Sequence, residues 1–116
     1  MLPAPSIAAR YWRRTVSGMV DHVVLLALRT DIRGGDLSGL GHLLARLPER
    51  IEGIQAVRFG PSSSPEGLEQ GYGYAFIITF TDELARDRYL PHPEHAPLST
   101  LVRQLSERVL VFDITT

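Results

Sequence analysis

Val23-Val24-Leu25-Leu26-Ala27-Leu28 is an uninterrupted apolar run that ends at Arg29. A short apolar run bounded by polar residues predicts a β-strand with both of its faces buried. An antiparallel strand with one face in water would alternate apolar and polar residues instead. The segments 73–80 and 108–114 also carry apolar residues at both parities, and we expect both to be strands. The sequence therefore predicts a sheet that needs cover on both faces.

The first predicted helix follows this strand. Leucines recur at helical spacing from Leu37 to Leu47, and Asp36 stands where an N-cap is expected. The segment from Ile54 to Phe59 then alternates and predicts a second strand. Residues 60–71 hold three Ser, two Pro and three Gly among few apolar side chains, which indicates a long exposed loop.

A second helix is expected after the strand over residues 73–80. Thr81 is a candidate N-cap, and the helix runs to about Tyr89. A short third helix ends near Leu105, before the last strand from Arg108 to Ile114. The order β-α-β-β-α-β is the ferredoxin-like arrangement, an α+β fold with a four-stranded antiparallel sheet.

The apolar character of both sheet faces predicts a homodimer. The helices of such a chain cover only one face of its sheet. Each large aliphatic side chain left in water on the other face loses the stabilisation of about 1.5–3 kcal/mol that burial would give. A second copy packed sheet to sheet by two-fold symmetry covers that face and makes a dimeric α+β barrel. The alternative is that loops or N-terminal residues of the same chain cover it.

Composition excludes several classes of chemistry. The chain has no Cys, so it has no disulfide, thiolate nucleophile or sulfur-ligated zinc. All 12 basic residues are Arg, which removes Schiff-base chemistry on lysine. A net charge of −1 gives no electrostatic reason to expect nucleic acid or an anionic membrane as partner. No apolar run approaches the ~20 residues of a membrane span. We expect a cytoplasmic protein without a cofactor.

Residues 1–18 differ from the rest of the chain. They hold three Arg, no acidic residue and no clear hydrophobic period. We expect them to be an N-terminal extension of a domain over residues 19–116, with Met19 as a possible alternative start. Tyr11 and Trp12 are candidates to pack this extension onto the dimer.

The densest group of chemically active side chains is Tyr89-Leu90-Pro91-His92-Pro93-Glu94-His95. The prolines stiffen this loop and hold a phenol and two imidazoles close together. Such a group is suited to proton transfer. His22 stands at the start of the first strand, in parity with Val24 and Leu26.

Five segments together resemble the stress-responsive dimeric A/B barrel (Dabb) family, over about Met19 to Ile114. They are Asp21-His22-Val23-Val24, Ile51-Glu52-Gly53-Ile54, Gly71-Tyr72-Gly73-Tyr74, Tyr89 with His92-Pro93-Glu94-His95, and Val109-Leu110-Val111-Phe112-Asp113. The resemblance implies a homodimer of ferredoxin-like chains whose two sheets form a barrel. Most members have no assigned reaction, and one closes a linear polyketide by an intramolecular aldol condensation.

Resemblance to that polyketide cyclase implies site residues. Its catalytic histidine and tyrosine match His95 and Tyr89, and a further pocket histidine matches His22. Tyr74 stands where the cyclase has another histidine, and Pro91 replaces an aliphatic residue, so the substrate and the loop conformation can differ. Asp113 matches a family aspartate, which we expect to pair with a group at a strand end or on the partner.

The resemblance supports a mechanistic hypothesis without a cofactor. His95 is a general base that removes a proton beside a carbonyl, since imidazole titrates at about 6.5. Tyr89, with a phenol pKa of about 10, donates a hydrogen bond to the enolate oxygen. His22 and Tyr74 orient the ligand. The expected apolar wall consists of Val24, Leu26, Phe76, Val109 and Val111.

Structural roles compete with these assignments. His95 can cap the last helix or bind a backbone carbonyl, and Tyr89 can be a core aromatic. We expect His92 to stabilise the loop and His42 to be solvated. A metal site built from His22, His92 and His95 is disfavoured, because no carboxylate has a diagnostic spacing and the prolines prevent a helical His pair.

Three classes of function remain open from the sequence. The first is a dimer that binds a small apolar or aromatic ligand without turnover. The second is a cofactor-free cyclase or lyase acting on an enolisable carbonyl compound. The third is a structural, stress-protective oligomer.

Overall fold

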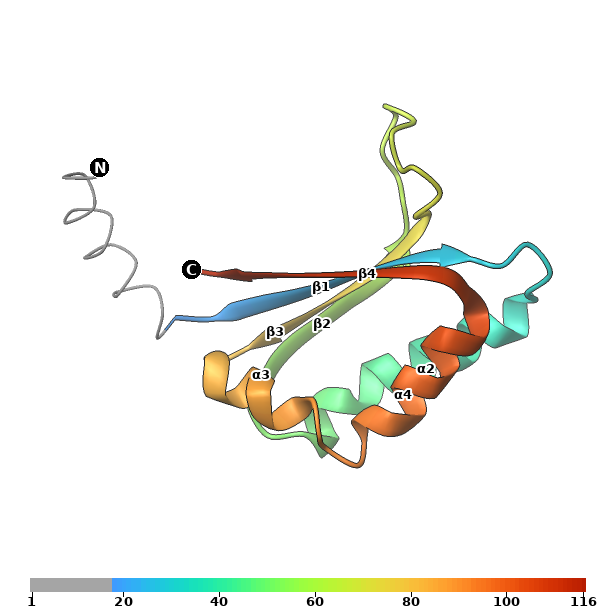
Figure 1. The fold of residues 1–116 in the computed structure, drawn as a ribbon. Coiled ribbons are helices and arrows are strands. Elements are labelled where there is room, and N and C mark those ends of the chain that lie inside the picture. The colour runs from blue at the N-terminus through green and yellow to red at the C-terminus, as the bar shows by residue number, and fades with distance from the viewer. Residues whose placement is uncertain (1–17) are drawn as a thin grey trace, which may run out of the picture.

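A computed structural model describes residues 18–116 of the chain. The expectations for residues 1–17, including the packing of Tyr11 and Trp12, lie outside this range. The described elements follow one another as β1 (Val20–Leu28), α2 (Gly34–Arg50), β2 (Ile54–Pro61), β3 (Tyr74–Phe80), α3 (Glu83–Tyr89), α4 (His95–Leu105) and β4 (Ser106–Thr115) (Figure 1).

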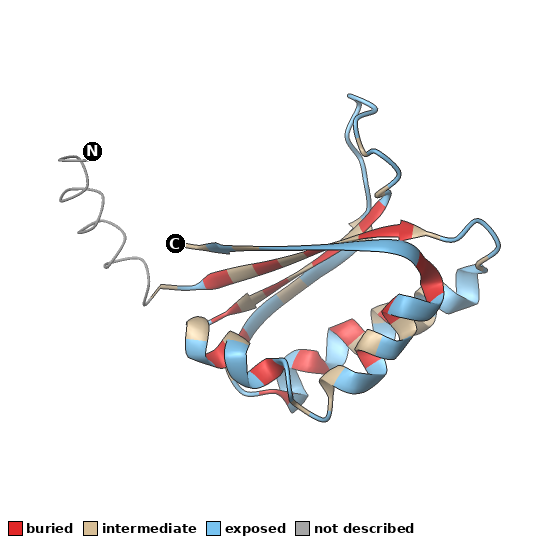
Figure 2. Cartoon of the chain, viewed as in Figure 1, coloured by how far each residue is buried: buried red, intermediate tan, exposed pale blue. Residues whose placement is uncertain are grey.

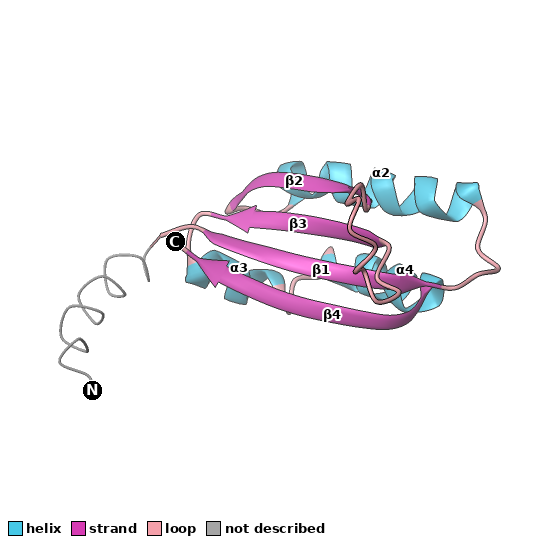
Figure 3. Cartoon of the chain, turned by 90° about the horizontal axis from the view of Figure 1, so that it is seen from above, coloured by secondary structure: helices cyan, strands magenta, loops and turns pink. Residues whose placement is uncertain are grey.

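The four strands form one antiparallel sheet in the order β2-β3-β1-β4. The register places Val24 between Phe76 of β3 and Val111 of β4. All three helices lie on the same side of this sheet, as the view in Figure 3 shows. This confirms the ferredoxin-like α+β fold predicted from the order of elements.

The first helix begins three residues before the predicted start, and the N-cap of the second lies one residue after the predicted one. The first helix begins at Gly34 rather than at Leu37, so Asp36 lies inside its first turn. There Asp36 accepts a hydrogen bond from the backbone N–H of Arg33, with N to Oδ2 at 2.9 Å. In the second helix Asp82, not Thr81, is the N-cap and accepts from the backbone N–H of Ala85 at 2.8 Å. Both carboxylates satisfy otherwise unpaired N–H groups of a first turn.

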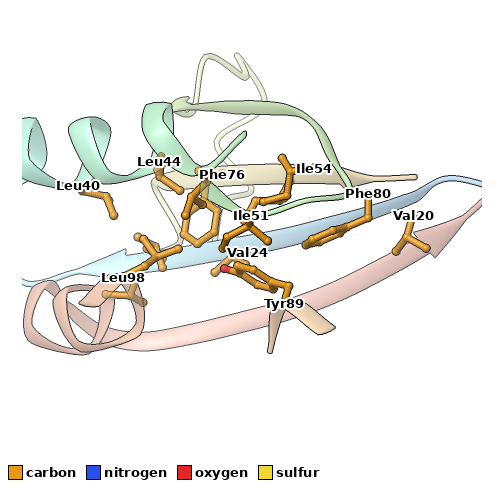
Figure 4. Packing of buried hydrophobic residues seen from close by; sticks show 14 of the residues in the cluster. Val20, Val24, Leu40, Leu44, Ile51, Ile54, Phe76, Phe80, Tyr89 and Leu98 are labelled. Atoms are coloured by element: carbon orange, nitrogen blue, oxygen red, sulfur yellow. The ribbon is translucent and has the colours of Figure 1, made fainter. Parts of the chain in front are cut away.

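The core lies between the helices and the helix-facing side of the sheet (Figure 4). Residues of even number in β1 point into it, since β1 alternates from Val20 to Leu26 between buried and half-buried positions. Helix α2 contributes a buried stripe at 40, 44 and 47, the spacing of one helical face. Each such side chain adds about 1.5–3 kcal/mol through burial. This packing fixes the strands against which the site is built.

The opposite side of the sheet has no helix over it among residues 18–116 (Figures 1 and 2). Strand β4 presents Leu110, Phe112 and Ile114 there, and Phe112 is 64% exposed. The register pairs these residues with Leu25, Val23 and Asp21 of β1. The result is a largely apolar surface on the side that the helices leave bare.

The described residues include no helix that is both long enough and apolar enough to cross a membrane.

Candidate functional site

A cavity of about 250 Å³ lies between the helix-facing side of the sheet and helices α3 and α4. Strands β1, β3 and β4 form its floor. Its lining is His22, Val24, Phe76, Tyr89, Leu90, His95, Leu98, Ser99, Val102, Val109 and Val111. Seven of these eleven side chains are apolar, which is the usual composition of a small-molecule site.

Tyr89 and His95 meet across the loop that joins α3 to α4. Tyr89 is the last residue of α3 and His95 is the first of α4. Their ring centroids are 4.5 Å apart and the rings are inclined by 62°. Backbone hydrogen bonds hold the connection: the N–H of His92 donates to the carbonyl of Tyr89, and that of His95 to His92. The chain is thereby folded back so that both rings face the cavity.

The loop histidine has a local role. The backbone N–H of Glu94 donates to Nδ1 of His92 at 3.0 Å, and His92 does not line the cavity. His42 is exposed on α2, with Nδ1 2.8 Å from the carbonyl oxygen of Ser38.

Burial sets the protonation states of this pair. It lowers the pKa of His95 below its ordinary value. The backbone carbonyl of Leu90 opposes this shift, and the electrostatic effect of the nearby Arg103 and His22 side chains reinforces it. Burial also raises the pKa of Tyr89 well above that of a free phenol. At neutral pH the site therefore holds a neutral imidazole beside a protonated phenol.

Tyr89 is 1% exposed, and its ring packs among core residues. Figure 4 shows the ring lying along the helix side of the sheet, with its hydroxyl directed toward Val24. The ring is 5.1 Å from that of Phe80, centroid to centroid. Core packing thus fixes the position of a hydroxyl that reaches the cavity.

The third polar group is His22 on β1, which contacts a carboxylate on β4. Its Nδ1 lies 2.8 Å from Oδ1 of Asp113, the residue directly opposite in the strand register. The other carboxylate oxygen of Asp113 accepts a hydrogen bond from Nη1 of Arg86, also at 2.8 Å. His22 is only 6% exposed, and its ring centroid is 5.8 Å from that of Tyr89.

The structure brings most of the predicted site residues together. His22, Tyr89 and His95 line the cavity with the expected wall residues Val24, Phe76, Val109 and Val111.

Tyr74 and Leu26 do not line it. They face each other in the register one step beyond the pair Val24 and Phe76, and both are buried in the core. Burial raises the pKa of the Tyr74 phenol, and Tyr74 borders a different hollow beside the 62–73 loop.

Sequence reasoning missed two polar residues. Ser99 lies four residues after His95, which is one helical turn, so the i, i+4 spacing on α4 was the available signal. Arg86 had no such signal, because its partner Asp113 is distant in sequence. The resemblance implied that Asp113 pairs with a strand-end or partner group; in the structure it lies 2.8 Å from Nδ1 of His22, near the start of β1.

Residues 18–116 include no group of three or more His, Cys, Asp or Glu side chains that could hold a metal ion.

The structure is that of a ferredoxin-like α+β protein in which two histidines and a tyrosine line one cavity on the helix side of the sheet. A family profile described as Stress responsive A/B Barrel Domain (Dabb) matches residues 20–116. The chain therefore belongs to this family.

Two characterised relatives are similar to most of the chain. The stress-response A/B barrel domain-containing protein HS1 of Arabidopsis thaliana is 32% identical over 96 residues, covering 83% of this chain and 88% of HS1. Olivetolic acid cyclase of Cannabis sativa is 24% identical over 96 residues, covering 83% of this chain and 95% of the cyclase.

Among solved structures, a dimeric ferredoxin-like protein of unknown function from Jannaschia sp. CCS1 superposes with a TM-score of 0.77. It is 27% identical, and the match covers 85% of this chain and all of that one.

Proposed function

We propose that this protein is a homodimer whose cavity binds a small apolar or aromatic ligand carrying an oxygen function. The observation that carries this proposal is the convergence of three polar side chains, His22, Tyr89 and His95, on one apolar cavity. A volume of about 250 Å³ suits a ligand with roughly one ring, since cavities for drug-sized molecules are about 300–1,000 Å³.

The homodimer is supported by the uncovered side of the sheet. Leu110, Phe112 and Ile114 together form an exposed apolar stripe of the kind that marks an interface. The structural relative from Jannaschia sp. CCS1 is described as dimeric. A second copy on this side would bury the stripe and leave the cavity, on the other side, accessible.

A second proposal is that the site performs proton transfer, and the protonation states favour it. A half-buried neutral imidazole is a competent base near neutral pH, and a protonated phenol is a hydrogen-bond donor. His95 would take a proton from the carbon beside a carbonyl, and the C–H electron pair would move into the enolate. Tyr89 would stabilise the enolate oxygen with its O–H. The similarity to olivetolic acid cyclase agrees with such a step.

Deuterium exchange tests the chemistry without the physiological substrate. Acetophenone carries one ring and an enolisable methyl ketone, so loss of its methyl proton signal in D₂O reports proton abstraction. The wild-type protein is expected to accelerate this exchange, and Tyr89→Phe to reduce the acceleration by about 10²-fold, as for loss of one oxyanion donor. His95→Gln removes the base and is expected to abolish the acceleration.

His42→Gln is the matched control, because His42 is an exposed histidine on the outer helix α2. It should exchange at the wild-type rate. Equal acceleration by the wild type and His95→Gln would rule out the proton-transfer proposal. Binding of acetophenone to the wild type, measured by titration calorimetry, tests the ligand proposal separately.

A further inference from the structure

An arginine outside the cavity is joined to it through two hydrogen bonds. Arg86 on α3 donates from Nη1 to Oδ2 of Asp113, and Oδ1 of Asp113 lies 2.8 Å from Nδ1 of His22. Nε of Arg86 also donates to Asp87 at 2.9 Å. The guanidinium therefore donates to two carboxylates, and each carboxylate oxygen of Asp113 has one partner, Arg86 or His22.

The charges of Arg86 and Asp113 determine which atom is the donor in each of these two hydrogen bonds. A guanidinium is always protonated in proteins and has no acceptor, so it must donate to Asp113. An ionised carboxylate only accepts, so the hydrogen in the second contact must sit on Nδ1 of His22. In a neutral imidazole with a proton on Nδ1, Nε2 is an acceptor.

The remaining nitrogen of His22 serves the cavity. The ring lines the cavity, while its Nδ1 is turned to β4. The contact of His22 with Asp113 uses Nδ1, and this leaves Nε2 on the other side of the ring for a ligand. Tyr89 stands edge-on to the same ring at 5.8 Å. An acceptor on His22 and a donor on Tyr89 thus face one small space.

We propose that Arg86 is a positioning residue, which acts through Asp113 to hold His22 in the form protonated on Nδ1. His22 then presents Nε2 as an acceptor to the ligand, beside the hydroxyl donor of Tyr89. The ligand class that matches is a single-ring compound with both a hydroxyl and a carbonyl group. This ligand class rests on the proposed binding function, whereas the protonation pattern of His22 does not.

Nitrogen-15 NMR of the histidine rings measures that pattern without any ligand. The homodimer labelled on histidine is observed at pH 8, and a His22→Gln variant assigns the His22 signals among those of the four histidines. Wild-type His22 should be protonated predominantly on Nδ1. Asp113→Asn offers an amide donor to Nδ1 and should move the proton to Nε2. Arg86→Leu frees the Asp113 carboxylate and should give a mixture of both forms.

Arg88→Leu is the matched control, because Arg88 is an exposed arginine on the same helix with no ion pair among the described residues. It should keep the wild-type pattern. Arg86→Gln is a second, milder variant, and it should also give a mixture if Arg86→Leu does not fold. His22 protonated on Nε2 in the wild type would overturn the proposal. So would unchanged His22 signals in the folded Arg86 variants.

A pair of ligands tests the consequence for binding. 4-Hydroxyacetophenone can donate to His22, and its methyl ether cannot. The wild type should bind the hydroxyl compound about fivefold more tightly, as expected for one neutral hydrogen bond, and Asp113→Asn should lose this preference. A fixed Nδ1 proton with no binding of either compound would leave the role of Arg86 standing and count against the proposed cavity ligand. Equal binding of both compounds by the wild type would refute His22 as the ligand's acceptor.

Discussion

Tyr89 combines two roles that are often separate. Its ring is part of the core, packed against Phe80, and its hydroxyl end reaches the cavity. The two competing interpretations of this residue from the sequence, a core aromatic and a site residue, are therefore compatible. A side chain fixed by packing on all sides is a good donor for a site, because no entropy is lost in orienting it.

The two roles of Tyr89 predict different costs for two substitutions. Tyr89→Phe keeps the ring and removes only the hydroxyl, so the free energy of unfolding should change by no more than about 1 kcal/mol. Tyr89→Ala leaves a cavity in the core where the ring was, and it should lower the free energy of unfolding by about 3–5 kcal/mol. Urea unfolding followed by circular dichroism measures both. Equal costs would contradict the packing described for this ring.

His95 predicts how stability responds to acid. Its pKa is lowered in the folded chain, so the unfolded chain binds the proton more readily. Stability should therefore fall as pH decreases through the window just below the ordinary value of about 6.5, and this loss should stop below the folded pKa. His95→Gln should have a shallower loss between pH 7 and pH 5 in thermal unfolding. A slope identical to that of the wild type would contradict the shift.

At the scale of elements, Gly53 controls how α2 is joined to β2. Its φ is +95°, and an added Cβ would lie 2.6 Å from the Cβ of Ala85 on α3. Its carbonyl accepts a hydrogen bond from the N–H of Thr81 at 2.9 Å. Only glycine provides both the left-handed backbone and the close approach of α3.

Gly53→Ala should destabilise the protein by about 2–4 kcal/mol, which combines the backbone strain with the clash. Gly39→Ala is the control, because Gly39 lies inside α2 with free space around its Cα. That change should stabilise the protein by about 0.5–1 kcal/mol through helix propensity. Chemical unfolding of both variants measures the contrast. Similar effects at the two positions would show that Gly53 is not constrained.

The strands were predictable from the sequence because long apolar runs leave few other structures possible. The helix starts were harder to predict. Residues 81–83 are three polar residues in a row, so more than one of them could be the N-cap, and Gly34 and Gly35 are typical of a turn although α2 begins with them. In the site, strand parity placed His22 and Val24 on the correct face. Parity does not say how far along a strand the cavity extends, so Leu26 was also expected in its wall, and the resemblance to the cyclase added Tyr74; neither residue lines the cavity. The contact of Arg86 depends on the placement of α3 beside β4.

At the scale of the whole molecule, β4 has a larger share of exposed residues than the other three strands of the sheet (Figure 2). Phe112→Asp would place a charge in the apolar stripe on its outer side, where a second copy is proposed to pack. Sedimentation equilibrium should show a dimeric wild type and a monomeric Phe112→Asp variant. Leu84→Asp is the control, since Leu84 is equally exposed but lies on α3, on the other side of the sheet. A dimeric Phe112→Asp protein would place the interface elsewhere.

In strand β4, Val109 and Val111 face the cavity, whereas Leu110, Phe112 and Ile114 face the outer side of the sheet. In the proposed dimer, the same strand would therefore form both the contact between subunits and one wall of the cavity. When the chain is scarce, doubling its amount raises the number of paired molecules about fourfold by mass action. If only the dimer is functional, the amount of functional protein in a cell would therefore rise more steeply than the amount of chain that the cell makes.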